Sequence, residues 1–151
     1  MAWLTLKAMH VLAVVLWVGG MAFAHFFLRP AVQVLEPPQR LALMRQVLGR
    51  FLPAAGWAVF VALGTGLGLV ALWRSPANPA AMPVAWVLMG ALGLVMAGIY
   101  AAIRFALFPR FVRALDAQDL PAAAAALAHL RAWVGINLVF GMVVIAIAGF
   151  G

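Results

Sequence analysis

Four long apolar runs, separated by more polar connections, set the hydrophobic pattern of this chain. They cover approximately residues 4–28, 51–73, 84–108 and 130–150. Each run reaches the length of about 20 residues that a helix needs to cross a bilayer. We expect Pro30 to end the first helix and Pro109 to end the third. The pattern predicts a single all-α membrane domain over residues 1–151, a bundle of four transmembrane helices without an internal repeat.

The connection between the first two runs has a helical pattern of its own. Apolar side chains recur at helical spacing while the arginines fall elsewhere; the apolar positions are Leu41, Met44, Val47, Leu48 and Phe51. Such a segment is typical of a helix that places its apolar face in the membrane surface. We therefore expect an amphipathic interfacial helix that leads into the second run.

The connection before the fourth run predicts the start of another helix. Asp116 or Asp119 can cap its first turn, where Pro121 is tolerated because the missing N–H has no helical partner there. We expect the alanine run that follows to continue this helix into the fourth span.

Composition supports an integral membrane protein. The chain has 151 residues, of which 68% are hydrophobic and 9% are charged, and its mean hydropathy is +1.14. A soluble domain carries about 25% charged residues. The sequence contains no cysteine, which excludes disulfides, thiolate metal sites and cysteine nucleophiles. The basic residues lie beside the apolar runs, so we expect them to contact lipid headgroups of the bilayer and not nucleic acid.

The distribution of basic residues predicts the orientation. The two long connections and the adjoining helix ends hold Arg29, Arg40, Arg45, Arg50, Arg104, Arg110, Arg113 and Arg131. The opposite side holds Lys7 and Arg74. Basic loops stay in the cytoplasm, so the long connections are expected inside and both termini outside. The first run is too long for a signal-peptide core and is expected to remain in the membrane.

The first run contains two of the three histidines, His10 and His25. At about 100° per residue, His10, Trp17 and Met21 fall within roughly 40° of one another around the helix. His25 lies on the same side, roughly 22 Å further along the axis. An ionisable side chain inside a membrane span is costly unless it is shielded or used, so both histidines are candidates for function.

The outer half of the predicted bundle holds an imidazole near thioethers. Met9 and His10 come from the first run, and Met89 enters from the third. Imidazole and thioether together suit copper, especially Cu(I), and they also suit haem iron. The alternative is a structural histidine that is hydrogen-bonded between helices, with methionines as flexible packing.

The inner half of the bundle holds a second polar group. It comprises His25, Tyr100, Arg104 and Asn137, with His129 just outside the fourth run. His25 and His129 are candidate axial ligands of a haem whose propionates would meet the arginines. The alternative is a structural polar network near the interface, in which Asn137 hydrogen-bonds between helices.

The sequence carries no other catalytic pattern. Glu36, Asp116 and Asp119 are the three acids, and all of them lie in connections, so no carboxylate inside a span can relay protons. The chain has no phosphate-binding loop, dinucleotide fingerprint or serine-nucleophile motif. Any chemistry would therefore depend on a bound metal or haem, and whether the chain is an enzyme stays open.

Three stretches resemble a known family: KAMHVLAVVLWVGGMAFAHF, LMGALGLVMAGIYAAIRFALFPRFVRAL and HLRAWVGINLVFGM. They resemble the CopD family of membrane proteins associated with bacterial copper resistance and uptake, as a stand-alone four-helix copy. The pattern of Lys7, His10, Trp17 and Gly20 is also similar to the start of HemJ, a haem-containing protoporphyrinogen oxidase, and this resemblance implies a ligand role for His10. HemJ has a lysine early in its third helix that residues 86–90 lack.

The first hypothesis is therefore a CopD-like protein of the bacterial inner membrane that binds or transports copper, with His10 at the outer end of the path and His25 at the inner end. A homodimer fits this function because four helices enclose little room, and a periplasmic copper carrier is an expected partner. The second hypothesis is a b-type haem protein for electron transfer or HemJ-like oxidation. The third is an accessory membrane subunit without a cofactor.

Overall fold

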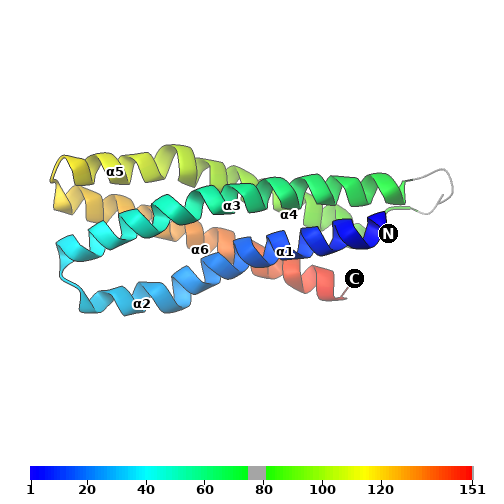
Figure 1. Cartoon of the computed structure of the whole chain (residues 1–151), viewed down its shortest axis with the longest axis horizontal. Coiled ribbons are helices and arrows are strands. Elements are labelled where there is room, and N and C mark those ends of the chain that lie inside the picture. Colours follow the sequence, from blue (N-terminus) through cyan, green and yellow to red (C-terminus); the bar gives the residue numbers. More distant parts are fainter. Residues whose placement is uncertain (75–80, 151) are drawn as a thin grey trace.

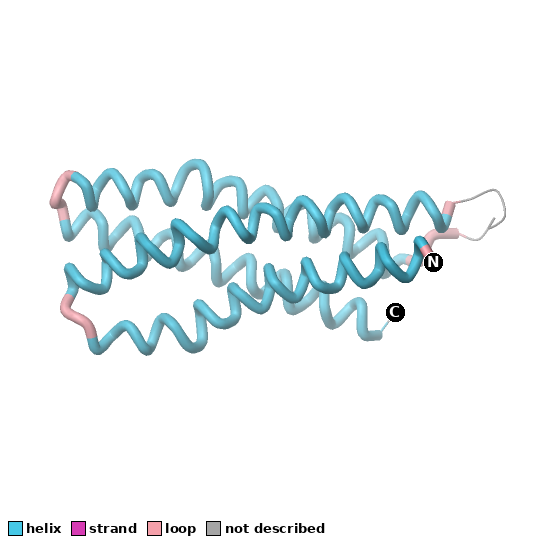
Figure 2. Tube along the Cα trace, in the orientation of Figure 1, coloured by secondary structure: helices cyan, strands magenta, loops and turns pink. Residues whose placement is uncertain are grey.

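The chain forms an all-α bundle in the computed structural model, which describes residues 1–74 and 81–150. Its four long helical segments run up and down, and both termini lie at one end while two tight turns lie at the other (Figures 1 and 2). The segments are Ala2–Val34, Pro37–Trp73, Val84–Asp116 and Leu120–Gly149, each long and apolar enough to cross a membrane. The predicted four-helix membrane bundle is confirmed.

The elements divide these segments further. The first segment contains α1 (Ala2–Phe23), the π-helical η1 (Ala24–Leu28), α2 (Arg29–Ala31) and the 3-10 helix η2 (Val32–Val34). The second is α3 (Pro37–Trp73). The third contains α4 (Val84–Ala102), the π-helical η3 (Ile103–Leu107) and α5 (Phe108–Asp116). The fourth is α6 (Leu120–Phe150).

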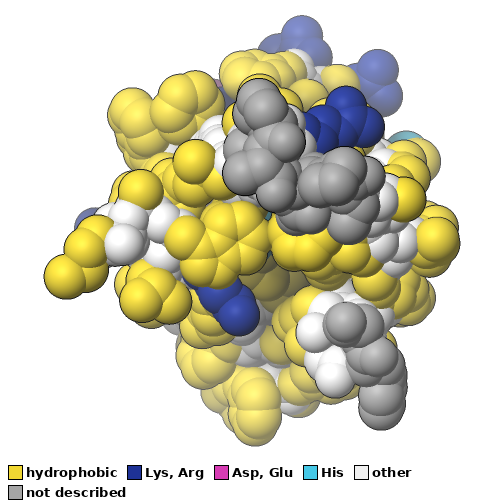
Figure 3. Space-filling view, turned by 90° about the vertical axis from the view of Figure 1, so that its right-hand side faces the viewer, with side chains coloured by type: hydrophobic (Ala, Val, Ile, Leu, Met, Phe, Trp, Pro, Cys, Tyr) yellow, Lys and Arg dark blue, Asp and Glu magenta, His cyan; other side chains and the backbone are white. Residues whose placement is uncertain are grey.

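The outside of the bundle is apolar. Large hydrophobic side chains are exposed along every long segment, for example Leu12, Phe60, Leu94, Phe105 and Val139, each more than half exposed. Hydrophobic atoms also cover most of the end and flanks that face the viewer in Figure 3. A soluble monomer rarely exposes so large an apolar surface, so this surface is the one that lipid covers.

The predicted interfacial helix is wrong in its placement, although its helical pattern is correct. Residues 37–50 are the first half of α3, continuous with the second span. Leu41, Met44 and Leu48 are buried in a core cluster with Phe111 of α5. The apolar face therefore packs against protein and not against the membrane surface, because α5 and α6 extend beside it.

The expected ends of the first and third spans are also corrected. Helix continues beyond Pro30 to η2 and beyond Pro109 to the end of α5. A proline ring clashes with the carbonyl four residues before it, here those of Phe26 and Phe105. Both carbonyls lie in the π-helical segments, whose wider turn relieves the clash. The first and second halves of the chain therefore have the same order of elements: a helix, a π turn with a proline soon after it, a tight turn and then a long helix.

The predicted start of α6 is confirmed. The backbone N–H of Ala122 donates to Oδ1 of Asp119 at 2.9 Å, and Pro121 lies in the first turn. Glu36 and Gln39 form the corresponding capping box at the start of α3. These two caps define the tight turns at the arginine-rich end of the bundle.

Candidate functional site

His10 lies on α1 and hydrogen-bonds to α3. Its Nδ1 is 2.8 Å from the carbonyl oxygen of Ala62 and 3.1 Å from Oγ1 of Thr65. A carbonyl oxygen only accepts, so Nδ1 carries the proton and donates it. Nε2 therefore holds the lone pair of the ring, and a metal ligand requires that lone pair.

The surroundings of His10 hold the ring in this orientation. Thr65 is buried, and its hydroxyl donates to the carbonyl of Val61 at 2.5 Å, so its oxygen can accept from Nδ1. A Cβ at Gly66 would come within 3.2 Å of Cε1 of His10, so glycine makes the close approach of the imidazole possible. The ring is half-buried. Its orientation is thus set by α3 and not by the lipid.

The two predicted sulfur ligands, Met9 and Met89, lie in different environments. Met9 is 45% exposed and adjacent to His10 in the chain, so it lies about 100° away around α1. Met89 is half-buried on α4. Among residues 1–74 and 81–149, no group of three His, Cys, Asp or Glu side chains could hold a metal ion. The hydrogen bonds described for His10 all reach α3, so a thioether ligand stays a prediction.

Trp17 and Met21 are core residues. They are 4% and 3% exposed and pack in a cluster with Ala55, Val59 and Met96 from α3 and α4. This packing buries the side of the first helix that carries both histidines, at a point between His10 and His25. Their supporting role at a metal site stays a prediction.

An aromatic cluster lies at the end of the bundle that carries the termini. Trp3 stacks on Trp86 with ring centroids 5.8 Å apart, and Trp73 lies 5.2 Å from Trp86. The sequence places each indole near a span end, where tryptophan commonly marks the headgroup level. The sequence does not indicate that the three indoles meet, because they come from three different helices.

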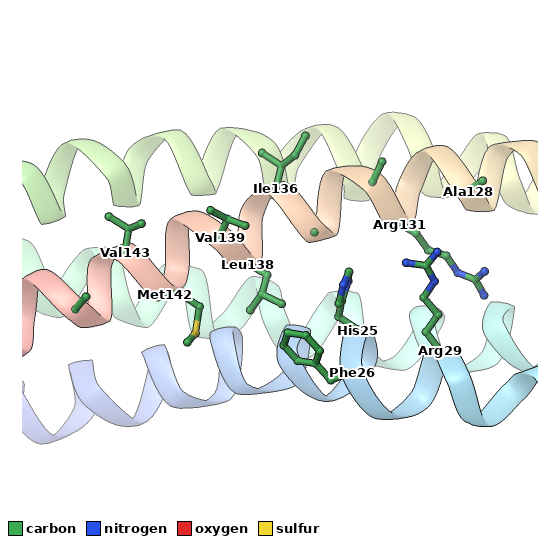
Figure 4. Close-up of a pocket in the computed structure, with 13 residues that line it drawn as sticks. His25, Phe26, Arg29, Ala128, Arg131, Ile136, Leu138, Val139, Met142 and Val143 are labelled. Carbon is green, nitrogen blue, oxygen red and sulfur yellow. The ribbon is translucent and has the colours of Figure 1, made fainter.

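His25 lies in the π turn η1 and faces α6 (Figure 4). A Cβ at Gly135 would be 3.6 Å from Cε1 of His25, so the ring packs on the α6 backbone. His25, Phe26 and Arg29 line one wall of a groove of about 830 Å³, and α6 forms the other wall. Sequence reasoning found His25 but missed this groove, because the groove depends on how α6 packs.

His129 and Tyr100, two other predicted inner residues, hydrogen-bond to partners other than His25. His129 is exposed, and its Nε2 accepts from Nε1 of Trp133 at 3.0 Å on the same helix. Tyr100 donates its hydroxyl to the carbonyl of Leu52 at 2.8 Å. Neither bond includes His25, so the described contacts give no support to a haem shared by His25 and His129.

Arg104 and Asn137 have local roles. The guanidinium of Arg104 lies over the ring of Phe105, 5.6 Å from its centroid. Asn137 is 1% exposed, and its Oδ1 has no hydrogen-bond partner within the part of the chain that the structure describes. Neither residue lines the groove beside His25.

Fold and site together define a multi-pass membrane protein that holds an oriented imidazole in the half of the bundle nearer the termini. The chain belongs to the CopD family, Copper resistance protein D, which it matches over residues 45–150. No curated protein and no solved structure matches the chain. The family match begins within α3, so His10 and His25 lie outside it. The case for those two residues rests on geometry and on the resemblance of the first run.

Proposed function

We propose that this chain binds copper as a CopD-family membrane protein, with Nε2 of His10 as the ligand. The observation that carries this proposal is the 2.8 Å hydrogen bond from Nδ1 of His10 to the carbonyl of Ala62. Metal-binding histidines almost always donate the second ring nitrogen in this way, which fixes the tautomer and increases the basicity of the ligand nitrogen. Membership of the CopD family is the reason for proposing copper as the metal.

Cu(I) is the oxidation state that these residues suit. Thioethers and imidazoles are soft or borderline ligands, and the chain offers no thiolate. Met89 is the candidate second ligand in the same chain. Met9 faces outward and would reach a copper ion held by a second copy, which would make the working unit a homodimer.

Transport requires more than one site of modest affinity along the path. His25 lies 15 residues after His10 on the same helical segment, about 22 Å further along the axis. His10 would receive copper at the outer end, from a periplasmic carrier, and His25 would pass it on at the inner end. This direction assumes the orientation predicted from the arginines, with both termini outside the inner membrane.

Competition for Cu(I) tests the proposal. The detergent-purified protein is titrated against a coloured Cu(I) chelator, alongside His10→Ala and the control His129→Ala. We expect the wild type and the control to withdraw one copper per chain and His10→Ala to lose affinity by about tenfold or more. Equal affinity in His10→Ala, or no withdrawal by the folded wild type, contradicts the proposal.

A b-type haem is the second candidate, because an imidazole with one fixed nitrogen also suits an axial ligand. Absorption spectroscopy of the purified protein distinguishes the two. A Soret band that His10→Ala removes favours haem, and a colourless preparation that binds Cu(I) favours copper. A colourless protein that binds neither points to an accessory subunit without a cofactor.

A further inference from the structure

The groove between the first segment and α6 is polar at one end and apolar along the rest of its length. One end contains His25, Arg29 and Arg131, while the remaining wall along α6 is apolar and includes Val139 and Val143 (Figure 4). Phe26, Val139 and Val143 are exposed where they line the groove, so it opens sideways along the membrane spans. A ligand that fits it must therefore have one charged end and a long apolar part.

The charged end is cationic, and within residues 1–74 and 81–150 neither Arg29 nor Arg131 forms an ion pair. The guanidinium groups of Arg29 and Arg131 extend toward each other in Figure 4, and Arg40 is close enough to act electrostatically on Arg131. Glu36, Asp116 and Asp119 do not line the groove. Two guanidinium groups therefore meet in the groove, where an anion would reduce their mutual repulsion.

Arg131 also has unused hydrogen-bond donors. Its Nε and Nη2 are buried and have no partner among the residues that the structure describes. A buried donor without an acceptor is costly, and the cost is greater for a charged group. A guanidinium presents its N–H groups in a planar fork that fits the oxygens of a phosphate.

We infer that the groove binds one anionic phospholipid, whose phosphate group contacts Arg29 and Arg131 and whose acyl chain runs along α6. The apolar wall reaches Ala146, about 22 Å along the helix from Arg131. One leaflet of the hydrocarbon core is about 15 Å thick, so the wall is long enough for one chain. Basic pockets between membrane helices bind anionic headgroups by this chemistry. The inference is independent of copper at His10.

Native mass spectrometry of the detergent-purified protein tests this site. Phosphatidylglycerol and zwitterionic phosphatidylcholine are added separately to the wild type and to Arg131→Gln, with Arg110→Gln as the matched control. Arg110 is exposed at the same end of the bundle and lies outside the groove. We expect one tightly retained phosphatidylglycerol, weakened by about tenfold or more in Arg131→Gln and unchanged in Arg110→Gln.

A second variant separates loss of charge from loss of shape. Ala132 lines the groove and is exposed, so Ala132→Trp should block the acyl chain without removing an arginine or disturbing the core. We expect this variant to lose phosphatidylglycerol as well. Inorganic phosphate should not displace the bound lipid, because the acyl chain contributes to its affinity.

Several results would overturn the inference. Equal retention of phosphatidylcholine, equal loss in the two arginine variants, or displacement by inorganic phosphate would each do so. A haem found in the groove, recognised by a Soret band that Arg131→Gln alters, would replace the lipid. Cu(I) affinity, measured in the same preparations, should stay unchanged in all three variants, so failure at one site is distinguishable from failure at the other.

Discussion

His10 and Ala62 join the first two long helices through a side-chain hydrogen bond of 2.8 Å to a backbone carbonyl. The bond gives the imidazole one tautomer and one orientation, and it leaves Nε2 as the only ring nitrogen with a lone pair. The same bond satisfies the polar ring inside an apolar bundle. A structural role and a ligand role for His10 are therefore compatible, and only a measurement on Nε2 separates them.

Thr65→Val should weaken copper binding without abolishing it. Thr65 Oγ1 lies 3.1 Å from Nδ1 of His10, while the stronger contact to Ala62 uses backbone and survives the substitution. Loss of an outer hydrogen bond to a ligand histidine costs about 10-fold to 100-fold in affinity, and we expect the low end of that range. The Cu(I) competition assay measures it.

The control for this prediction is Thr5→Val, which removes an exposed hydroxyl at the same end of the bundle. Its copper affinity should equal that of the wild type. A Thr65→Val protein that binds Cu(I) as tightly as the wild type would show that the orientation of His10 does not matter for the metal.

Cysteines at positions 45 and 116 should cross-link. Arg45 and Asp116 form an ion pair of 2.5 Å between α3 and α5, and the natural chain has no cysteine to interfere. A short bifunctional thiol reagent should join Arg45→Cys to Asp116→Cys within one chain, seen as a mobility shift in a gel, because the reagent replaces the length of the arginine side chain that a disulfide could not span. The pair Arg50→Cys with Asp116→Cys is the control, because one and a half helical turns separate Arg50 from Arg45.

This cross-link also tests where the first half of α3 lies. A helix lying on the membrane surface would not hold residue 45 beside residue 116. Efficient cross-linking of the control pair, or none of the 45–116 pair, would contradict the packing of α3 against α5.

Gly56→Ala should destabilise the bundle, and Tyr100→Phe should reduce that effect. A Cβ at position 56 would collide with the hydroxyl of Tyr100, which is held by its 2.8 Å hydrogen bond to the carbonyl of Leu52. Tyr100→Phe alone should cost about 1 kcal/mol through loss of this bond. In the double variant the collision with the hydroxyl is absent and only the 3.2 Å approach to Cζ of the ring remains, so the two effects should not add.

Thermal unfolding in detergent measures all three variants. We expect the double variant to lose less stability than the two single variants lose when their separate losses are added. Additive changes would mean that Tyr100 does not contact α3 at Gly56.

The sequence predicts the four spans because about 20 consecutive apolar residues leave few other structures available in lipid. It also predicts the start of α6, since Asp119 and Pro121 have strong local preferences for a first turn. Local preference misled at Pro30 and Pro109, where a π turn lets the helix continue. A proline in the sequence indicates that a helix must either end or change its turn, and only the packing of neighbouring helices shows which of the two occurs.

The candidate site was less predictable than the fold. Periodicity identified His10 and His25 as unusual residues, and the depth of each residue suggested the two clusters. Which atoms meet depends on the rotation and tilt of each helix, which hydropathy does not encode. For this reason the pairing of His10 with Ala62 and Thr65 and the groove beside Arg131 emerge only from the folded structure.

X-ray absorption spectroscopy of the Cu(I)-loaded protein tests the role of His10 most directly, because it detects the atoms bound to the metal. The account predicts an imidazole contribution together with sulfur in the wild type and in His129→Ala, and loss of the imidazole contribution in His10→Ala. A copper spectrum that stays the same in His10→Ala would contradict it.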